Sequence, residues 1–263
     1  MNDKESKDGK IKSLVKENSN VWNNYYKVHQ EGAVGNLYPN EPLIRIASKI
    51  FHSVEMDKYE YFNNVGKEND EKNRIKDNKK TSLDIGFGHV SNMLMMKDKG
   101  FLPQGIEVSA EAVERGRQSL SNLKIDDIKL SEWNDRPKLP FADDSFDMIY
   151  GLQCIYYNLD IELVIDEVFR CLKKDGIFCF SFFSTRHDYH NYSNLIEEFE
   201  LYNVREWSSD HPSTRIRGAK LIAPKSKEDL AKMFNAFSQV RVFTEETDFM
   251  PMFNSWDYVY GIK

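Results

Sequence analysis

A glycine loop and an acidic residue stand at the spacing of a nucleotide-binding site. The loop lies in the run Leu83-Asp84-Ile85-Gly86-Phe87-Gly88, and Glu107 follows it by about 20 residues. Glycine lets the backbone turn sharply and approach a ligand where a Cβ atom would clash. The helix expected after the loop offers unpaired N–H groups, and a carboxylate ending the next strand can accept hydrogen bonds from ribose hydroxyls. The spacing therefore favours a nucleotide site over a surface turn.

The loop departs from the fingerprint of dinucleotide-binding enzymes. That fingerprint, G-x-G-x-x-G or G-x-G-x-x-A, ends in a small residue that lets the helix pack closely on the strand. Ser91 occupies this last position, so the nicotinamide pattern is incomplete, although serine is small. A nicotinamide-dependent oxidoreductase and a catalytically silent cofactor-binding module therefore stay open as alternatives.

The elements that must position the loop alternate between strands and helices. We expect strands at 81–86, 101–108, 125–130, 146–152 and 177–183, with helices at 90–99 and from Ser109, Asp160 and Ser226. Such alternation implies right-handed crossovers and a parallel sheet with helices on both faces. The final runs 239–245 and 256–262 have no long helix between them, so we expect a hairpin that makes one strand antiparallel.

Four motifs in this order resemble those of class I S-adenosylmethionine-dependent methyltransferases. They are LDIGFG (83–88), GIEVS (105–109), LPFADDSFDMIYG (139–151) and LKKDGIFCFSFF (172–183), and the third is similar to the small-molecule, type 11 group. The resemblance implies an α/β fold: a Rossmann-like three-layer sandwich with a mostly parallel seven-stranded sheet and an antiparallel C-terminal strand. It implies transfer of a methyl group from S-adenosyl-L-methionine to a small-molecule acceptor by in-line displacement.

The resemblance also assigns residues to the cofactor. Asp84 and the loop Gly86-Phe87-Gly88 would contact the methionine moiety, and Glu107 the ribose hydroxyls. Val108 would pack on the adenine, and Gln153 would lie near the carboxypropyl end and the sulfonium.

The stretch after the third strand fits the family less well. The family usually offers the adenine ring an acid and a backbone amide there, where this chain has Glu132 and Trp133. The separation of these residues from the LPF motif is longer than usual. The resemblance therefore implies an adenine site at Glu132 and Trp133 whose individual contacts stay open.

No residue is assigned as catalytic. Holding donor and acceptor in line accelerates methyl transfer, and a base is needed only for a protonated nucleophile of high pKa. The candidates after the fourth and fifth strands are Tyr156, Tyr157, His187, Asp188 and His190. His187 and His190 have no identifiable third ligand, so we predict no metal site and favour a polar loop over a general base.

Two segments would border the acceptor. Residues 1–80 are expected to form an N-terminal arm or helical cap and a charged linker, and residues 81–263 the cofactor-binding domain with a lid insert at about 184–223. A helix is expected near 192–202. The arm's aromatic residues would either fold over the cationic sulfonium or pack on the sheet; they are Trp22, Tyr25, Tyr26 and Tyr38. In the insert, Arg215, Arg217 and Lys220 would form a solvated basic face or receive an acidic acceptor.

Composition limits the partners and the location. The 263 residues include 36 basic and 42 acidic side chains, and the net charge of −6 argues against nucleic acid or an anionic membrane as partner. No apolar run approaches the roughly 20 residues that span a bilayer, and the first residues lack the apolar core of a secretory signal. The three cysteines have no metal or disulfide spacing, so we expect reduced thiols and a cytoplasmic protein. The acceptor and the oligomeric state stay open.

Overall fold

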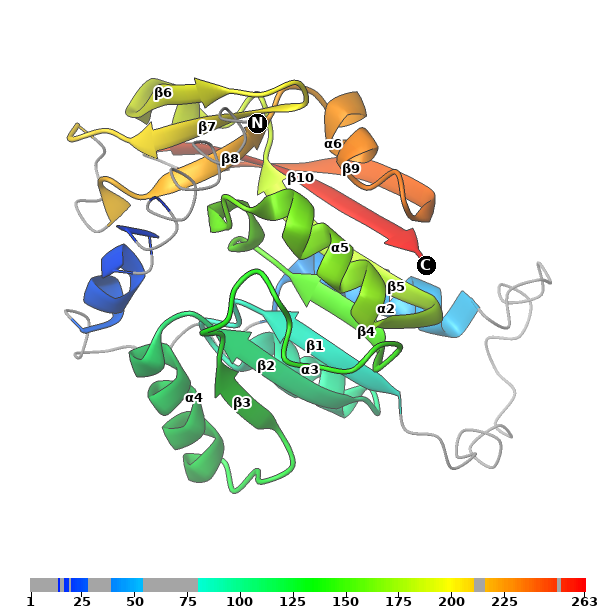
Figure 1. The fold of residues 1–263 in the computed structure, drawn as a ribbon. Coiled ribbons are helices and arrows are strands. Elements are labelled where there is room, and N and C mark those ends of the chain that lie inside the picture. The colour runs from blue at the N-terminus through cyan, green and yellow to red at the C-terminus, as the bar shows by residue number, and fades with distance from the viewer. Residues whose placement is uncertain are drawn as a thin grey trace, which may run out of the picture.

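A computed structural model describes residues 14, 17–18, 20–27, 39–53, 80–210, 216–249 and 252–263. In this part of the chain a central sheet lies between two layers of helices, and a small second sheet lies at one end (Figure 1). The predicted three-layer α/β sandwich is therefore confirmed. None of the described helices combines the length and hydropathy that crossing a bilayer requires.

The central sheet has seven strands in the order β3-β2-β1-β4-β5-β10-β9. Their bounds are β1 Thr81–Ile85, β2 Leu102–Glu107, β3 Lys129–Glu132, β4 Phe146–Gly151, β5 Leu172–Phe183, β9 Ser238–Phe249 and β10 Met252–Ile262. β1 to β5 run parallel, and β10 is antiparallel to both β5 and β9, as the terminal hairpin predicted. The chain reverses its direction across the sheet between β1 and β4, which is where open α/β sheets bind ligands.

Besides the helical residues 20–27, the described chain has five further α-helices and two short 3-10 helices. They are α2 Glu41–Ser53, α3 Ser91–Asp98, α4 Ala110–Asn122, α5 Ile161–Cys171 and α6 Lys227–Met233, with the 3-10 turns η3 Ile155–Tyr157 and η4 Asp188–Tyr192. The apolar face of α5, with Val164 and Val168, packs on one side of the sheet, and Leu43 and Ala47 of α2 pack on the other. β5 is buried on both faces, and this explains its continuous apolar run from Ile177.

Most helix starts agree with the sequence. The Ser109 hydroxyl accepts a hydrogen bond from the Ala112 N–H at 3.3 Å and caps α4, and Ser226 caps α6 in the same way. Asp160 precedes α5, but its side chain makes no capping hydrogen bond. The third strand lies later than the expected 125–130, because its pairing with β2 starts at Lys129.

The helix expected near 192–202 is wrong. β6 (Ser193–Glu198) and β7 (Tyr202–Trp207) pair antiparallel there, and β8 (Lys220–Pro224) completes a three-stranded sheet. The turn between β6 and β7 is closed by a Phe199 N–H bond to the Tyr202 carbonyl at 2.9 Å. Tyr202 and Val204 alternate inward, so cross-strand pairing and a buried face decide the conformation over local helix propensity.

The N-terminal part is only partly described. α2 packs its apolar face against the central sheet, and residues 18, 22, 25 and 26 line the cavity at the carboxyl end of that sheet. The expected charged linker, apart from Lys80, lies outside the described residues, and so do Tyr38 and Arg215. The division of the chain at residue 80 therefore stays a prediction.

Candidate functional site

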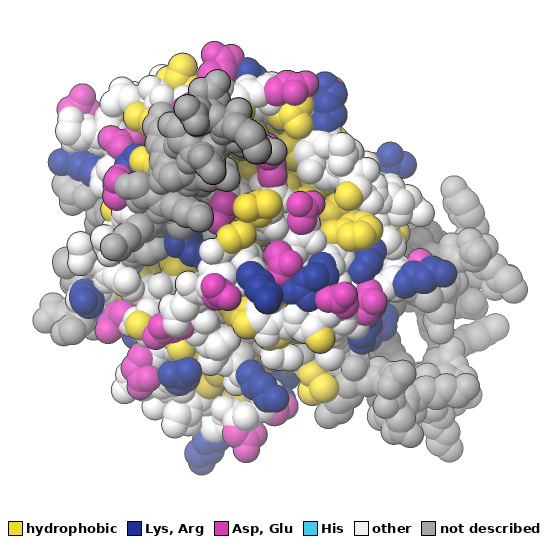
Figure 2. Space-filling model, in the orientation of Figure 1, with side chains coloured by type: hydrophobic (Ala, Val, Ile, Leu, Met, Phe, Trp, Pro, Cys, Tyr) yellow, Lys and Arg dark blue, Asp and Glu magenta, His cyan; other side chains and the backbone are white. Residues whose placement is uncertain are grey.

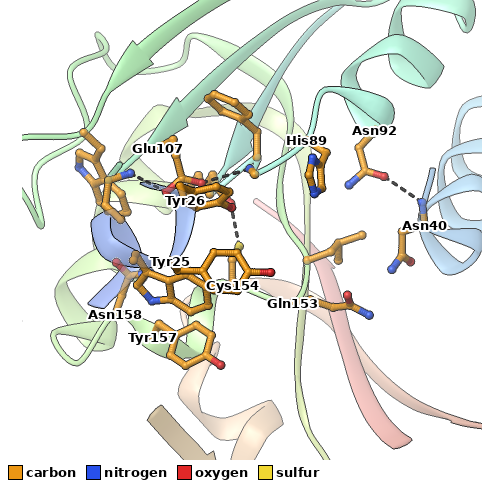
Figure 3. A pocket seen from close by; sticks show the side chains of 18 of the residues that line it. Tyr25, Tyr26, Asn40, His89, Asn92, Glu107, Gln153, Cys154, Tyr157 and Asn158 are labelled. Atoms are coloured by element: carbon orange, nitrogen blue, oxygen red, sulfur yellow. Dashed lines mark hydrogen bonds between the residues drawn. The ribbon is translucent and has the colours of Figure 1, made fainter. Parts of the chain in front are cut away.

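A cavity of about 650 Å³ opens at the carboxyl ends of β1, β2 and β4 (Figure 3). Its size falls within the range of small-molecule sites, about 300–1,000 Å³. Seven of the nine residues predicted to contact the cofactor line it: Gly86, Phe87, Gly88, Glu107, Val108, Trp133 and Gln153. Asp84 and Glu132 are not among the lining residues. The sequence motifs therefore converge on one cavity.

The glycine loop forms the floor of this cavity. Gly86 and Gly88 have φ values of 68° and 47°, in the left-handed region that favours glycine. A Cβ atom on Gly86 would lie 2.8 Å from the Cys154 sulfur, and one on Gly88 would lie 2.8 Å from the Tyr26 hydroxyl. Both glycines are therefore required by backbone conformation and by close packing.

Glu107 closes the loop from the end of β2. Its Oε2 accepts a hydrogen bond from the Gly88 N–H at 3.1 Å, and its Oε1 accepts one from the Val108 N–H at 2.7 Å. The side chain is buried, and burial raises the pKa of its carboxyl, while these backbone N–H bonds and the Arg136 guanidinium lower it. The two buried oxygens of the Glu107 carboxylate are therefore held in place by the backbone N–H groups of Gly88 and Val108.

Asp84 lies under the loop rather than in the cavity. It is 1% exposed, and within the described part of the chain its Oδ2 has no hydrogen-bond partner. Burial, and secondarily the neighbouring Glu107, raise the pKa of its carboxyl well above the ordinary value. Its predicted contact with a methionine moiety stays a prediction.

Of the two residues expected at the adenine, Trp133 lines the cavity and Glu132 does not. The Trp133 N–H donates to the Glu107 carbonyl at 2.8 Å, and the indole lines the cavity and donates to the Lys138 carbonyl at 2.9 Å. Glu132 is exposed, and its Oε2 accepts a hydrogen bond from Asn134 at 3.1 Å. Trp133 is therefore in place for a ligand, whereas the Glu132 carboxylate lies outside the cavity.

The N-terminal arm covers the opening. Trp22, Tyr25 and Tyr26 line the cavity, and the Trp22 ring meets the Tyr157 ring edge-on with centroids 4.7 Å apart. The Tyr26 carbonyl accepts a hydrogen bond from Arg115 of α4. Figure 3 shows the Tyr26 side chain beside Glu107. These aromatic residues therefore border the site, as one of the two interpretations of the sequence expected.

Asn18 ties the arm to two other elements. Its Nδ2 donates to the Tyr157 carbonyl at 3.0 Å and to the Lys220 carbonyl at 2.8 Å. Its Oδ1 accepts from the Lys220 N–H at 2.8 Å, and the side chain is fully buried. One amide thus joins the arm, the turn after β4 and the strand β8 of the insert.

Of the five candidate bases, only some lie near the cavity. Tyr157 lines the cavity, and burial raises the pKa of its hydroxyl, which accepts a hydrogen bond from the Trp207 indole at 3.2 Å. Tyr156 and His187 lie in an aromatic cluster with Phe183. Asp188 and His190 do not line the cavity. Among the candidates, only Tyr157 is placed to meet an acceptor there.

None of the described residues of the insert, 184–210 and 216–223, lines the cavity, although the insert was expected to form a lid. It reaches the site through the Trp207–Tyr157 hydrogen bond and through Asn18. Lys220 is neither a solvated cation nor a ligand for an acidic acceptor, because its buried ammonium pairs with Glu17 at 2.8 Å and Glu206 at 3.0 Å.

Several lining residues were not predicted from the sequence. They are Asn18, Pro39, Asn40, Ile85, His89, Ser91, Asn92, Arg136, Leu152, Cys154 and Asn158. The Asn40 N–H donates to the Asn92 Oδ1 at 2.9 Å, so α2 and α3 meet at one end of the cavity. Burial lowers the pKa of His89 there. Some of these residues lie in or beside the sequence motifs, as Ile85 and Ser91 do, whereas Asn18, Asn40 and Asn92 had no sequence signal.

The fold and the cavity together define an α/β protein with a glycine loop at its topological switch point. Comparison with known proteins adds that residues 83–180 match the family model of a methyltransferase domain. The resemblance seen in the four motifs is thereby confirmed.

Individual relatives agree with this assignment. A sterol 4-C-methyltransferase of Caenorhabditis elegans is 32% identical over 96 residues, which is 36% of this chain and 29% of that protein. The chain thus spans about a third of the length of the curated relatives it matches.

Solved structures extend the similarity in fold. The PH0226 protein of Pyrococcus horikoshii has a TM-score of 0.50 at 19% identity, covering 87% of this chain and 94% of that one. Phosphoethanolamine N-methyltransferase 2 of Haemonchus contortus, solved with S-adenosyl-L-methionine, has a TM-score of 0.52 at 13% identity, covering 72% of this chain and 50% of that one. At these identities the likeness concerns the fold.

Proposed function

We propose that this protein is an S-adenosylmethionine-dependent methyltransferase that acts on a small, neutral acceptor. The observation that carries the proposal is the convergence of the glycine loop, Glu107, Val108, Trp133 and Gln153 on one cavity. A methyltransferase-domain match over residues 83–180 supports the same chemistry. The alternatives of a nicotinamide enzyme and a silent binding module receive no comparable support.

The cavity fits the cofactor by the chemistry of its walls. The glycine loop lines the cavity, and the buried Glu107 carboxylate, which already accepts from two backbone N–H groups, offers its two oxygens to ribose hydroxyls. Gly86 and Gln153 would hold the methionine end. When bound, the cofactor supplies a methyl carbon whose bond to sulfur breaks, with the electron pair staying on sulfur, as the acceptor atom bonds to that carbon.

The acceptor would lie between the arm and the turn after β4. Trp22, Tyr25 and Tyr157 supply aromatic surface there, and Asn18 an amide. Aromatic walls favour an apolar acceptor, because desolvating a charged molecule against them is costly. A neutral, largely apolar molecule fits these walls, and a relative whose named acceptor is a sterol supports that class.

Tyr157 would orient the acceptor rather than deprotonate it. Its buried hydroxyl has a raised pKa and stays protonated, so it can donate a hydrogen bond to an acceptor oxygen or nitrogen. Positioning of donor and acceptor then supplies most of the acceleration. A proton released by the acceptor would pass to solvent.

The proposed setting is the cytoplasm, with no nucleic-acid or membrane partner. Cys154, Cys171 and Cys179 are free thiols, which suits a reducing compartment. On the face shown in Figure 2, basic and acidic side chains are interspersed. Some basic side chains of the chain pair with acids, as Arg170 does with Glu167 at 2.6 Å. The described residues on this face form no basic stripe for a phosphate backbone.

A binding experiment with two acidic variants tests the proposal. Calorimetry should show S-adenosylhomocysteine binding to the wild type and a loss of about 100-fold in Glu107→Ala, since a charged acceptor with several hydrogen bonds is removed. Glu132→Ala should bind like the wild type, because this carboxylate lies outside the cavity. No heat with the wild type would refute the function. Transfer of a labelled methyl group to a panel of sterols and macrolides would then identify the acceptor.

A further inference from the structure

The cavity wall after β3 presents a cation where the family presents an acid. Glu132 is exposed and bonds to Asn134, whereas Arg136, four residues later, lines the cavity. The extra length between Trp133 and the LPF motif is what brings Arg136 back to the wall. At this point of the cavity wall, the chain therefore offers a hydrogen-bond donor, Arg136, in place of the hydrogen-bond acceptor that an acid would provide.

The stretch that carries Arg136 is anchored on both sides. The Trp133 N–H donates to the Glu107 carbonyl at 2.8 Å, and its indole N–H donates to the Lys138 carbonyl at 2.9 Å, which closes the loop. Behind it, the Leu139 N–H donates to Glu167 of α5 at 2.8 Å. These bonds fix the backbone on either side of Arg136.

The guanidinium is held inside the wall by polar and aromatic neighbours. It lies 6.0 Å from the Trp133 ring centroid and donates to the Asn158 Oδ1 at 3.5 Å. The carboxylates of Glu107 and Asp160 act on it through space and favour its charged form, although burial lowers its pKa. An arginine stays protonated under such conditions. The cavity thus has a partly desolvated, planar N–H donor at one end.

The strand order would bring this donor close to the adenine if the cofactor binds as proposed. With the ribose at Glu107 on β2 and the methionine end at Gly86 on β1 and Gln153 after β4, the base must extend toward β3. The walls on that side are Val108, Trp133 and Arg136. Val108 and the indole supply apolar surface for the ring, and Arg136 is the charged side chain at its edge.

We propose that Arg136 recognises the adenine of S-adenosylmethionine by donating a hydrogen bond to a ring nitrogen, in the place where the family usually uses an acid. This inference rests on the proposed function. An acid accepts from the exocyclic N6 amino group, whereas a guanidinium has donors only and must select N1, N3 or N7. The chain should therefore tolerate a methyl group on N6 and discriminate against loss of one ring nitrogen.

Calorimetry with base-modified S-adenosylhomocysteines tests this inference. The ligands are the parent compound, its N6-methyl derivative and the 1-deaza, 3-deaza and 7-deaza analogues. The proteins are the wild type, Arg136→Met, Arg136→Lys and the control Arg241→Met, whose side chain is exposed on the outer strand β9. We expect the wild type and the control to bind one deaza analogue at least about tenfold more weakly than the parent, the scale of a hydrogen bond to a charged group.

The variants should lose this discrimination. Arg136→Met should bind the parent compound about tenfold more weakly than the wild type does, and it should bind the three deaza analogues about as tightly as it binds the parent. Arg136→Lys keeps the charge without the planar fork, so it should discriminate less than the wild type between the parent and the deaza analogue. Equal discrimination between parent and deaza analogues in the wild type and in Arg136→Met would overturn the inference. An equal loss of affinity for every ligand in Arg136→Met would also overturn it, because that result indicates that Arg136 acts only through the charge of Glu107. If Arg136→Met fails to fold, Arg136→Lys decides. Failure of the parent to bind the wild type would instead sink the proposed function.

Discussion

The hydroxyl of Tyr26 lies 2.8 Å from the point that a Cβ atom of Gly88 would occupy. The arm therefore rests on the nucleotide loop at a position where the loop has no side chain. Because Glu107 bonds to the same glycine, the arm, the loop and the Glu107 carboxylate share one small region of the cavity. Changes at this contact should affect arm and cofactor together.

Gly88→Ala should displace the arm and weaken cofactor binding. The new methyl group would meet the Tyr26 hydroxyl, and the left-handed backbone adds about 1–2 kcal/mol of strain. Gly100→Ala is the matched control, since Gly100 also has a positive φ but nothing lies within 4 Å of its added Cβ. We expect S-adenosylhomocysteine affinity to fall at least tenfold in Gly88→Ala only, with faster proteolysis of the arm.

Removing the hydroxyl tests the steric cause. Adding Tyr26→Phe to Gly88→Ala deletes the atom that clashes and should restore most of the lost affinity. If the double variant binds as poorly as Gly88→Ala alone, backbone strain and not the arm contact explains the loss.

Cofactor affinity should depend on pH through Glu107. Burial raises the pKa of its carboxyl, and the ionised form is the better acceptor for ribose hydroxyls. As the pH falls through this raised pKa, affinity should decrease at a higher pH than an ordinary glutamate would give. Calorimetry between pH 4.5 and 8 measures the profile, and Glu107→Gln should be weak and flat. A wild-type profile as flat as that of the variant would contradict this.

The buried carboxyls of Asp84 and Glu107 should lower the stability of the ligand-free protein at neutral and higher pH. Asp84 and Glu107 have raised folded-state pKa values, so protonation favours the folded state below the ordinary carboxyl range, and this contribution is lost as the pH rises through the raised values. Asp84→Asn should therefore raise the melting temperature at pH 8 more than at pH 4. Thermal unfolding at both pH values measures the difference, and an equal shift at both would rule out this electrostatic cause.

Trp207→Phe should change the use of the acceptor without changing cofactor affinity. The indole donates a buried hydrogen bond to the Tyr157 hydroxyl, and its loss leaves that hydroxyl less firmly oriented, by about 1–3 kcal/mol. We expect an altered KM or kcat for the acceptor once it is known. In the Tyr157→Phe background the same substitution should add little, and additive effects in this double-mutant cycle would show that Trp207 acts elsewhere.

Asn18→Ala should release the arm from the insert. The substitution leaves the Lys220 N–H and carbonyl without this partner, at a cost of about 1–3 kcal/mol in the free energy of unfolding. Asn20→Ala, on the same helical segment but exposed, is the control and should be neutral. Denaturant unfolding of both variants provides the comparison, and equal losses in the two would remove Asn18 from its linking role.

Local patterns predicted the parts of the molecule that depend on neighbours in sequence. The parallel strands, the Ser109 and Ser226 caps and the terminal hairpin follow from periodicity and turn chemistry. The glycine loop and Glu107 were found because their spacing reflects one strand–helix–strand unit.

Long-range pairing explains what the sequence did not reveal. The helix expected near 192–202 is a hairpin because β7 pairs with β8, which lies beyond residue 216. Arg136, Asn40 and Asn92 enter the cavity through loop and helix placement, which no spacing encodes. Lys220 resembled a surface cation, since its partners Glu17 and Glu206 come from distant segments.

The Asn18 side-chain amide bonds to both the N–H and the carbonyl of Lys220, as the backbone of a neighbouring strand would. This has a consequence for the order in which the ribosome completes the protein. Asn18 leaves the ribosome about 200 residues before its partner on β8, and domains usually begin folding from the end made first. The bond between the arm and β8 therefore forms only after Lys220 has been synthesised, whereas the contacts of Tyr26 with Arg115 and of Trp22 with Tyr157 involve residues that are made earlier.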